Sequence, residues 1–123
     1  MFRKVMRPGP KHPITVEPTA GRVLVRAGRR TVADSTNALT LRESTYPPVQ
    51  YIPLGDIDRA LLRRTDSKTY CPFKGDAGYY SVVTPDAEIT DAGWTYEQPY
   101  PAVQDIAGYV AFYPNKVEIS VEN

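Results

Sequence analysis

Residues 69–80, which read TYCPFKGDAGYY, concentrate the side chains that could do chemistry. They include the only cysteine, Cys71, and, three positions later, Lys74, one of five lysines. A cation beside a thiol stabilises the thiolate, which is the reactive form. Cys71 is therefore a candidate nucleophile or redox thiol, although unpaired cysteines are also common as small core residues. The only histidine, His12, is distant in sequence, so a Cys–His pair would require the amino-terminal arm to fold over the site.

Lys74 is also a candidate ligand-binding residue, because glycines follow it at Gly75 and Gly78. Glycine permits the positive φ angles of backbone anion sites, so Lys74 could hold a phosphate or carboxylate there. The segment lacks the spacing of a phosphate-binding P-loop. A turn lysine paired with an acid such as Asp76 is the alternative interpretation.

Glu43 lies in the run LRESTYPPVQY at residues 41–51. If its side chain points inward, it is a buried carboxylate that needs a partner, and Lys74 or Arg42 could be that partner. Glu43, Lys74 and Cys71 would then form an acid–base or anchoring set. The alternative is that Glu43 faces solvent.

The chain is rich in aromatic residues, more than one small core needs. They could line a cleft for a planar or sugar ligand, form a dimer interface, or pack in the core with their hydroxyls reaching water or backbone. These residues are Tyr46, Tyr51, Tyr79, Tyr80, Trp94, Tyr96, Tyr109 and Tyr113.

Composition narrows the classes of protein to consider. A chain of 123 residues with 41% hydrophobic and 24% charged residues is typical of one soluble globular domain. A net charge of +1 gives no reason to expect a nucleic-acid or membrane partner. One cysteine and one histidine are a poor set of metal ligands, so we expect neither metal nor cofactor. The single cysteine fits a cytoplasmic protein.

Twelve prolines and nine tyrosines favour a mainly β fold of compact antiparallel sheets and hairpins. Residues 1–13 are predicted to be an extended, basic, proline-rich arm before a single domain at 14–123. We expect hairpins at 22–34 and 109–121, an edge strand at 49–52, a polar loop at 86–93, and one short helix around 56–63 that Asp56 caps. Further strands are predicted at 14–17, 38–43 and 78–83.

The series LRESTYPPVQYIP, TYCPFKGDAGYYSV, WTY and IAGYVAFY resembles the bacterial family called domain of unknown function 427, over about residues 13–121. The resemblance implies a single small antiparallel β domain and favours an inward Glu43. It implies no known activity. A nucleotidyltransferase-type label is sometimes attached to the family, but paired metal-binding carboxylates are not recognisable here. The residues that match the family's characteristic positions are Glu43, Tyr46, Tyr51, Cys71, Lys74, Gly75, Tyr80, Trp94, Tyr96, Phe112 and Tyr113.

The sequence therefore leads to three hypotheses. The first is a domain that binds a small anionic or polar ligand in a pocket of cysteine, lysine, glutamate and aromatic side chains. The second is a non-catalytic homodimeric interaction module, and the third is a small enzyme that uses Cys71 or Lys74, with Glu43 as a further catalytic candidate. The predicted ligand-binding residues are Glu43, Tyr46, Tyr51, Lys74, Gly75, Tyr80, Trp94 and Tyr96.

Overall fold

The structure is a computed structural model that describes residues 3–123. Within that range the chain is mainly β, as the sequence predicts, and its helical parts are short 3-10 turns. The strands are β1 (Ile14–Pro18), β2 (Arg22–Ala27), β3 (Arg30–Ser35), β4 (Leu39–Glu43), β5 (Val49–Tyr51), β6 (Leu62–Cys71), β7 (Gly75–Val83), β8 (Glu88–Thr95), β9 (Val110–Phe112) and β10 (Glu118–Glu122).

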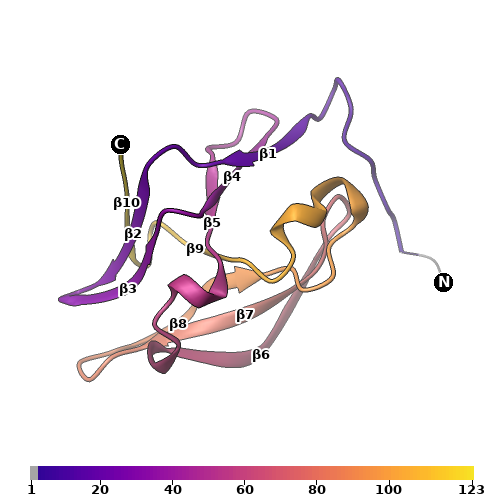
Figure 1. The fold of residues 1–123 in the computed structure, drawn as a ribbon. Coiled ribbons are helices and arrows are strands. Elements are labelled where there is room, and N and C mark those ends of the chain that lie inside the picture. Colours follow the sequence, from indigo (N-terminus) through magenta and orange to yellow (C-terminus); the bar gives the residue numbers. More distant parts are fainter. Residues whose placement is uncertain (1–2) are drawn as a thin grey trace.

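The strands form three antiparallel sheets, with the orders β1-β4-β5, β10-β2-β3 and β6-β7-β8-β9 (Figure 1). The first and third sheets are joined where Ile52, just after β5, bridges to Val110 of β9. Ile57, in the segment between β5 and β6, bridges to Ala33 of β3 and so attaches this segment to the second sheet. These bridges hold the edges of the sheets together around a shared interior.

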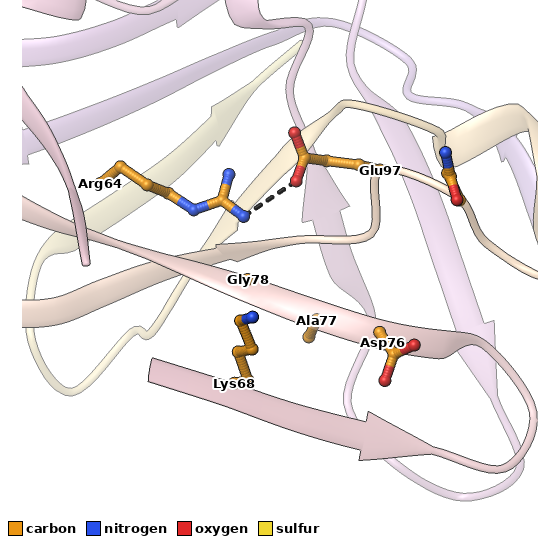
Figure 2. Close-up of a pocket in the computed structure, with 7 residues that line it drawn as sticks. Arg64, Lys68, Asp76, Ala77, Gly78 and Glu97 are labelled. Carbon is orange, nitrogen blue, oxygen red and sulfur yellow. Dashed lines mark hydrogen bonds and ion pairs between the residues drawn. The ribbon is translucent and has the colours of Figure 1, made fainter. Parts of the chain in front are cut away.

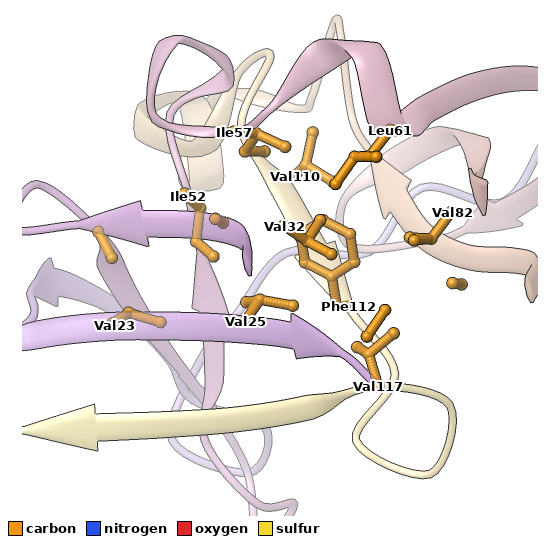
Figure 3. Close-up of a cluster of buried hydrophobic side chains, with 14 residues drawn as sticks. Val23, Val25, Val32, Ile52, Ile57, Leu61, Val82, Val110, Phe112 and Val117 are labelled. Atoms are coloured by element: carbon orange, nitrogen blue, oxygen red, sulfur yellow. The ribbon is translucent and has the colours of Figure 1, made fainter. Parts of the chain in front are cut away.

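Two clusters of buried side chains fill that interior, and single strands contribute to both. Along β7, Tyr80 and Val82 pack with the first cluster, whereas Ala77 and Tyr79 belong to the second. This follows from the period of two in a β-strand, which sends successive side chains to opposite faces. Figure 3 shows the first cluster, which contains Val23, Val25, Val32, Ile52, Ile57, Leu61, Val82, Val110, Phe112 and Val117.

The second cluster is the more aromatic of the two, and it is the one beside which the candidate site lies. Its buried members are Leu41, Tyr51, Ala77, Tyr79, Tyr96, Val103, Ile106 and Ala111. Strand β9 separates the two clusters, because Ala111 faces the second while Val110 and Phe112 face the first.

Several predicted elements are confirmed. Strands β2 and β3 form the expected hairpin, and Gly28 in its turn has a φ of 59° that glycine adopts without strain. Strand β5 lies at the edge of its sheet, after Pro47 and Pro48, as expected for a strand that follows prolines.

The short helix expected around residues 56–63 is present only as 3-10 turns, η1 (Leu54–Asp56) and η2 (Arg59–Leu61). Between them Ile57 is extended, because it bridges to β3, and the helix cannot continue through it. Asp58 rather than Asp56 caps the second turn, accepting a hydrogen bond from the Ala60 amide at 3.1 Å. From Leu62 the chain is already strand β6.

The polar loop expected at 86–93 is wrong, since β8 begins at Glu88. This strand reads as polar because its first half is largely exposed and carries a bulge at Asp91, whose φ is 50°. The Asp91 carboxylate accepts hydrogen bonds from Thr65 at 2.7 Å and Ser67 at 2.6 Å, which ties the bulge to β6. Strand β6, equally polar, was not predicted either.

The hairpin expected at 109–121 is also wrong, although both strands exist. Strand β9 pairs with β8 and β10 pairs with β2, so the two lie in different sheets. The turn between them is tight, because the amides of Lys116 and Val117 both donate to the Tyr113 carbonyl. It redirects the chain instead of returning it, and β9 takes a position where all three of its side chains are buried.

Candidate functional site

The centre of the site is an ion pair between Lys74 and Glu43. Lys74 Nζ lies 2.6 Å from Glu43 Oε1, and the exposed fractions of the two side chains are only 9% and 14%. Glu43 is the last residue of β4, and Lys74 sits in the turn between β6 and β7. The Glu43 side chain therefore points inward, and its partner is Lys74, whereas Arg42 is exposed.

Cys71 also contacts the lysine. Its Sγ accepts a hydrogen bond from Lys74 Nζ at 3.5 Å, and the residue is half-buried against the aromatic cluster. The separation of three in sequence is bridged by a turn in which the Lys74 amide donates to the Cys71 carbonyl at 3.2 Å. The three catalytic candidates of the sequence thus lie in one continuous chain of contacts.

The second carboxylate oxygen of Glu43 contacts the amino-terminal arm. His12 Nε2 lies 2.8 Å from Glu43 Oε2, and the His12 ring stacks on Phe73 with centroids 4.1 Å apart and planes 7° apart. The register of β1 with β4, which places Ile14 opposite Glu43, brings His12, two residues before β1, to this carboxylate. Sequence reasoning did not include His12 among the site residues. The pairing of β1 with β4 is the signal that could have shown that His12 lies beside Glu43.

Two opposing effects act on the Glu43 carboxyl. Burial raises its pKa, but the hydrogen bonds from Lys74 and then His12, together with the positive charge of Lys74, outweigh burial and hold the pKa below its ordinary value. The carboxylate is therefore ionised at neutral pH and pairs with the lysine.

A cavity of about 300 Å³ opens beside this ion pair. Six of the eight predicted ligand-binding residues line it, namely Glu43, Tyr46, Tyr51, Lys74, Trp94 and Tyr96. Four further residues complete the wall: Tyr79 and Tyr113, which are among the aromatic residues that the sequence suggested could line a cleft, and Leu41 and Val49, which sequence reasoning did not include. Tyr46 is 63% exposed, which marks the solvent side of the cavity.

The aromatic wall is held by contacts among its own members. Trp94 lies against Tyr113 with ring centroids 4.5 Å apart, and its indole Nε1 donates to the Tyr51 hydroxyl at 3.2 Å. Burial raises the pKa of Tyr51 and of Tyr96, so both hydroxyls are neutral at ordinary pH and can donate or accept hydrogen bonds. Burial and a hydrogen bond with Tyr79 raise the pKa of Tyr113 to about 12.

Gly75 and Tyr80 do not line the cavity. Tyr80 is one position from Tyr79 on β7, so its ring lies on the opposite face, against the first core cluster and below the Arg64 guanidinium. Gly75 has a φ of 107° and starts β7, where its neighbours are the backbone atoms of residues 98–100. Its role in the site is to make the turn that carries Lys74.

A second, larger cavity of about 540 Å³ lies over β6 and β7, away from these residues (Figure 2). Its charged side chains are largely paired, since Arg64 contacts Glu97 at 2.8 Å and Asp76 contacts Arg3. The Arg64 guanidinium lies over Gly78, where a Cβ would be only 2.2 Å from Arg64 Nη2. Gly78 therefore makes room for this arginine and has no part in an anion site with Lys74.

Residues 3–123 contain no group of three or more His, Cys, Asp or Glu side chains arranged to hold a metal ion. The same residues contain no helix with the length and apolar character needed to cross a membrane.

Fold and site together define a class of protein: a small antiparallel β domain with a buried lysine–glutamate pair at one side of an aromatic cavity. Residues 15–123 match the family model described as domain of unknown function (DUF427), and the chain belongs to that family. A search among curated proteins found no similar sequence.

Proposed function

We propose that the domain binds a small molecule in the aromatic cavity, with a carboxylate or another hydrogen-bond acceptor at Lys74 and a planar apolar portion against the aromatic wall. The observation that carries this proposal is the position of Lys74, which is 7% exposed and yet lines a cavity. An ammonium group has three N–H donors. Glu43 and Cys71 accept two of these donors, which leaves one for a ligand.

The charge balance of the site indicates which acceptor fits best. Glu43 already neutralises Lys74, so the cavity is not strongly cationic and a multiply charged phosphate gains little there. A single carboxylate or a neutral carbonyl suits one remaining donor better. The neutral hydroxyls of Tyr51 and Tyr96 supply further hydrogen-bonding groups.

The walls indicate the rest of the ligand. Ligand pockets are mostly apolar with a few convergent polar groups, and typical volumes begin near ~300 Å³. The present cavity matches that lower limit, and the aromatic residues Tyr79, Trp94 and Tyr113 are part of its lining. A planar group about the size of one aromatic ring suits such walls.

Trp94 provides the test, because it is the only tryptophan in the chain and lines the cavity. We propose titrations with benzoate, benzamide, phenyl phosphate and cyclohexylamine, followed by Trp94 fluorescence. A saturable change is expected with benzoate or benzamide, weaker with phenyl phosphate and absent with the amine. Lys74→Met should weaken benzoate binding by at least about tenfold, as expected for the loss of a charge-assisted hydrogen bond.

Lys68→Met is the matched control, because Lys68 is an exposed lysine on β6 outside this cavity. It should leave the benzoate titration unchanged. The proposal fails if none of the compounds gives a saturable change, or if Lys68→Met and Lys74→Met have equal effects.

A second candidate function, an enzyme with Cys71 as nucleophile, is favoured by one observation: the 3.5 Å contact between Lys74 Nζ and Cys71 Sγ. Lys74 lies closer to Glu43, however, and the carboxylate takes up much of the charge that would stabilise a thiolate. The rate of Cys71 alkylation by iodoacetamide between pH 6 and 9 separates the two functions. A rate above that of a model thiol at pH 7 supports the enzyme, and an equal or lower rate removes it.

A further inference from the structure

The amino-terminal arm is expected from the sequence to be an extended, basic, proline-rich segment, and in the structure its side chains contact both the β6–β7 hairpin and the site. At its start, Arg3 pairs with Asp76 at 2.8 Å and lies over the Tyr70 ring, 3.6 Å from the centroid. Tyr70 also donates to the Lys4 carbonyl at 2.6 Å. Near its end, His12 reaches Glu43. In Figure 1 this indigo segment runs beside the hairpin of β6 and β7.

The two ends of the arm are therefore attached independently. Between them the Met6 amide donates to the Pro72 carbonyl at 2.9 Å. A groove of about 450 Å³ separates much of this middle part from the body, lined by Ile14, Phe73 and Tyr100 among others. Because Arg3, Lys4 and Met6 hold the first half, a change at His12 alone should leave the arm docked.

The Glu43 carboxylate divides its two oxygens between the arm and the pocket. Oε1 accepts from Lys74 at 2.6 Å, and Oε2 contacts His12 Nε2 at 2.8 Å. A carboxylate only accepts hydrogen bonds, so His12 Nε2 carries the proton in this contact. With both oxygens held, the carboxylate cannot rotate about its terminal bond, and the Lys74 ammonium is held at one place in the cavity.

We propose that His12 is a positioning residue of the Lys74 pocket. It acts on Lys74 through Glu43, and its ring is itself held by the stack on Phe73. The arm is then a working part of the binding site and not a spacer before the domain. The benefit of this positioning for ligand binding rests on the proposed function, but the effect of His12 on Lys74 can be tested without any ligand.

The test is the rate at which acetic anhydride labels Lys74, measured by mass spectrometry on the full chain against exposed Lys68 in the same sample. Lys74 is buried and pinned, so its labelling should be slow. His12→Ala frees the carboxylate and loosens the ammonium, so labelling of Lys74 relative to Lys68 should rise about fivefold, the equivalent of one hydrogen bond of ordinary net strength.

Two further variants distinguish positioning from simple packing. The Gln side-chain nitrogen is as many bonds from Cα as His Nε2, so His12→Gln should restore slow labelling. Asn is one bond shorter and cannot reach, so His12→Asn should label as fast as His12→Ala. The inference is overturned if His12→Ala leaves the Lys74 rate unchanged, or if Asn restores it as well as Gln does.

The benzoate titration separates this inference from the proposed function. If benzoate binds the wild-type chain, His12→Ala should weaken binding and His12→Gln should preserve it. If nothing binds but the labelling pattern is as expected, the proposed function fails and the positioning role of His12 stands. If benzoate binds and labelling does not respond to His12, the positioning role fails and the pocket stands.

Discussion

Lys74 and Glu43 are 31 residues apart in sequence, and their charged atoms meet at 2.6 Å in a place that water hardly reaches. Taking two charges out of water is unfavourable, and their mutual attraction offsets this only when the pair is intact. The pair is therefore a weak source of stability but a strong constraint on geometry. Each side chain depends on the other to be buried at all.

The first prediction concerns breaking this pair. Lys74→Met leaves the Glu43 carboxylate buried with His12 as its only partner, so we expect a loss of about 3 kcal/mol in the free energy of unfolding. Combining it with Glu43→Leu removes both charges, and the double variant should recover much of that loss. Urea denaturation measures all three chains, and Lys68→Met serves as the exposed control, expected within ~0.5 kcal/mol of wild type. Equal losses for the single and double variants would contradict the pairing argument.

The second prediction concerns acid. The pKa of Glu43 is lower in the folded chain than its ordinary value of 4.5, so the unfolded state binds more protons as the pH falls through this range. The Glu43 contribution to stability is thus fully present above about pH 4.5 and is lost as the pH falls through the lower folded value.

We therefore expect the stability gap between wild type and Glu43→Gln to be constant near neutral pH and to narrow below about pH 4.5. The carboxyls of Asp34, Asp76 and Asp91 also have lowered pKa values, but they are the same in both chains and cancel in the difference. Chemical denaturation at a series of pH values from 7 down to 3 measures the gap. A gap that widens on acidification would reverse the sign and refute the assignment.

The third prediction concerns the aromatic wall. Tyr51 is 1% exposed and its hydroxyl accepts the hydrogen bond from the Trp94 indole at 3.2 Å. Tyr51→Phe leaves that indole N–H without its partner, which should destabilise the chain by about 1–2 kcal/mol and shift Trp94 emission. Tyr46→Phe, at the exposed edge of the same cavity, is the matched control and should change stability by less than ~0.5 kcal/mol. Thermal unfolding and emission spectra read both outcomes.

The fourth prediction concerns the turn that carries Lys74. Gly75 has a φ of 107°, a backbone conformation that is strained for any residue with a side chain. A Cβ there would nevertheless meet no atom closer than 3.5 Å. Gly75→Ala should therefore destabilise through the backbone alone, by about 1–2 kcal/mol. It should also displace Lys74 and weaken benzoate binding.

Gly55 provides the comparison for that substitution, because its φ is not in the positive region and a Cβ there has open space. Gly55→Ala should be neutral or slightly stabilising, by up to ~1 kcal/mol. If urea denaturation gives the same change in the free energy of unfolding for Gly75→Ala and Gly55→Ala, the positive φ at Gly75 is not the reason for glycine at that position.

The local elements followed from the sequence where the pattern was strong. The alternation in residues 22–27, with Gly28 at the turn that follows, predicted the hairpin of residues 22–34, and the prolines before Val49 predicted an edge strand. Strands β6 and β8 were not predicted, because their sequences are polar. They are strands because both pair with β7, and because the hydroxyls of Thr65 and Ser67 hold the bulge at Asp91. The spacing of apolar residues within either segment does not indicate this pairing.

For the candidate site, the single thiol and the lysine three residues after it were enough to name Cys71 and Lys74, and the resemblance to the family favoured an inward Glu43. The faces of the strands were harder to assign. Tyr79 and Tyr80 are neighbours of the same type, and only the position of β7 between two clusters decides that the first lines the cavity and the second does not.

By itself, the sequence determined that this protein is a small mainly β domain of its family, because prolines, tyrosines and alternating residues limit the local backbone wherever they occur. Only the tertiary structure decided that the arm belongs to the site. The pairing of β1 with β4 sets His12 beside Glu43, and the turn at Gly75 sets Lys74 on the other side. Contacts between residues so far apart depend on strand register, which the whole fold specifies and no single segment encodes.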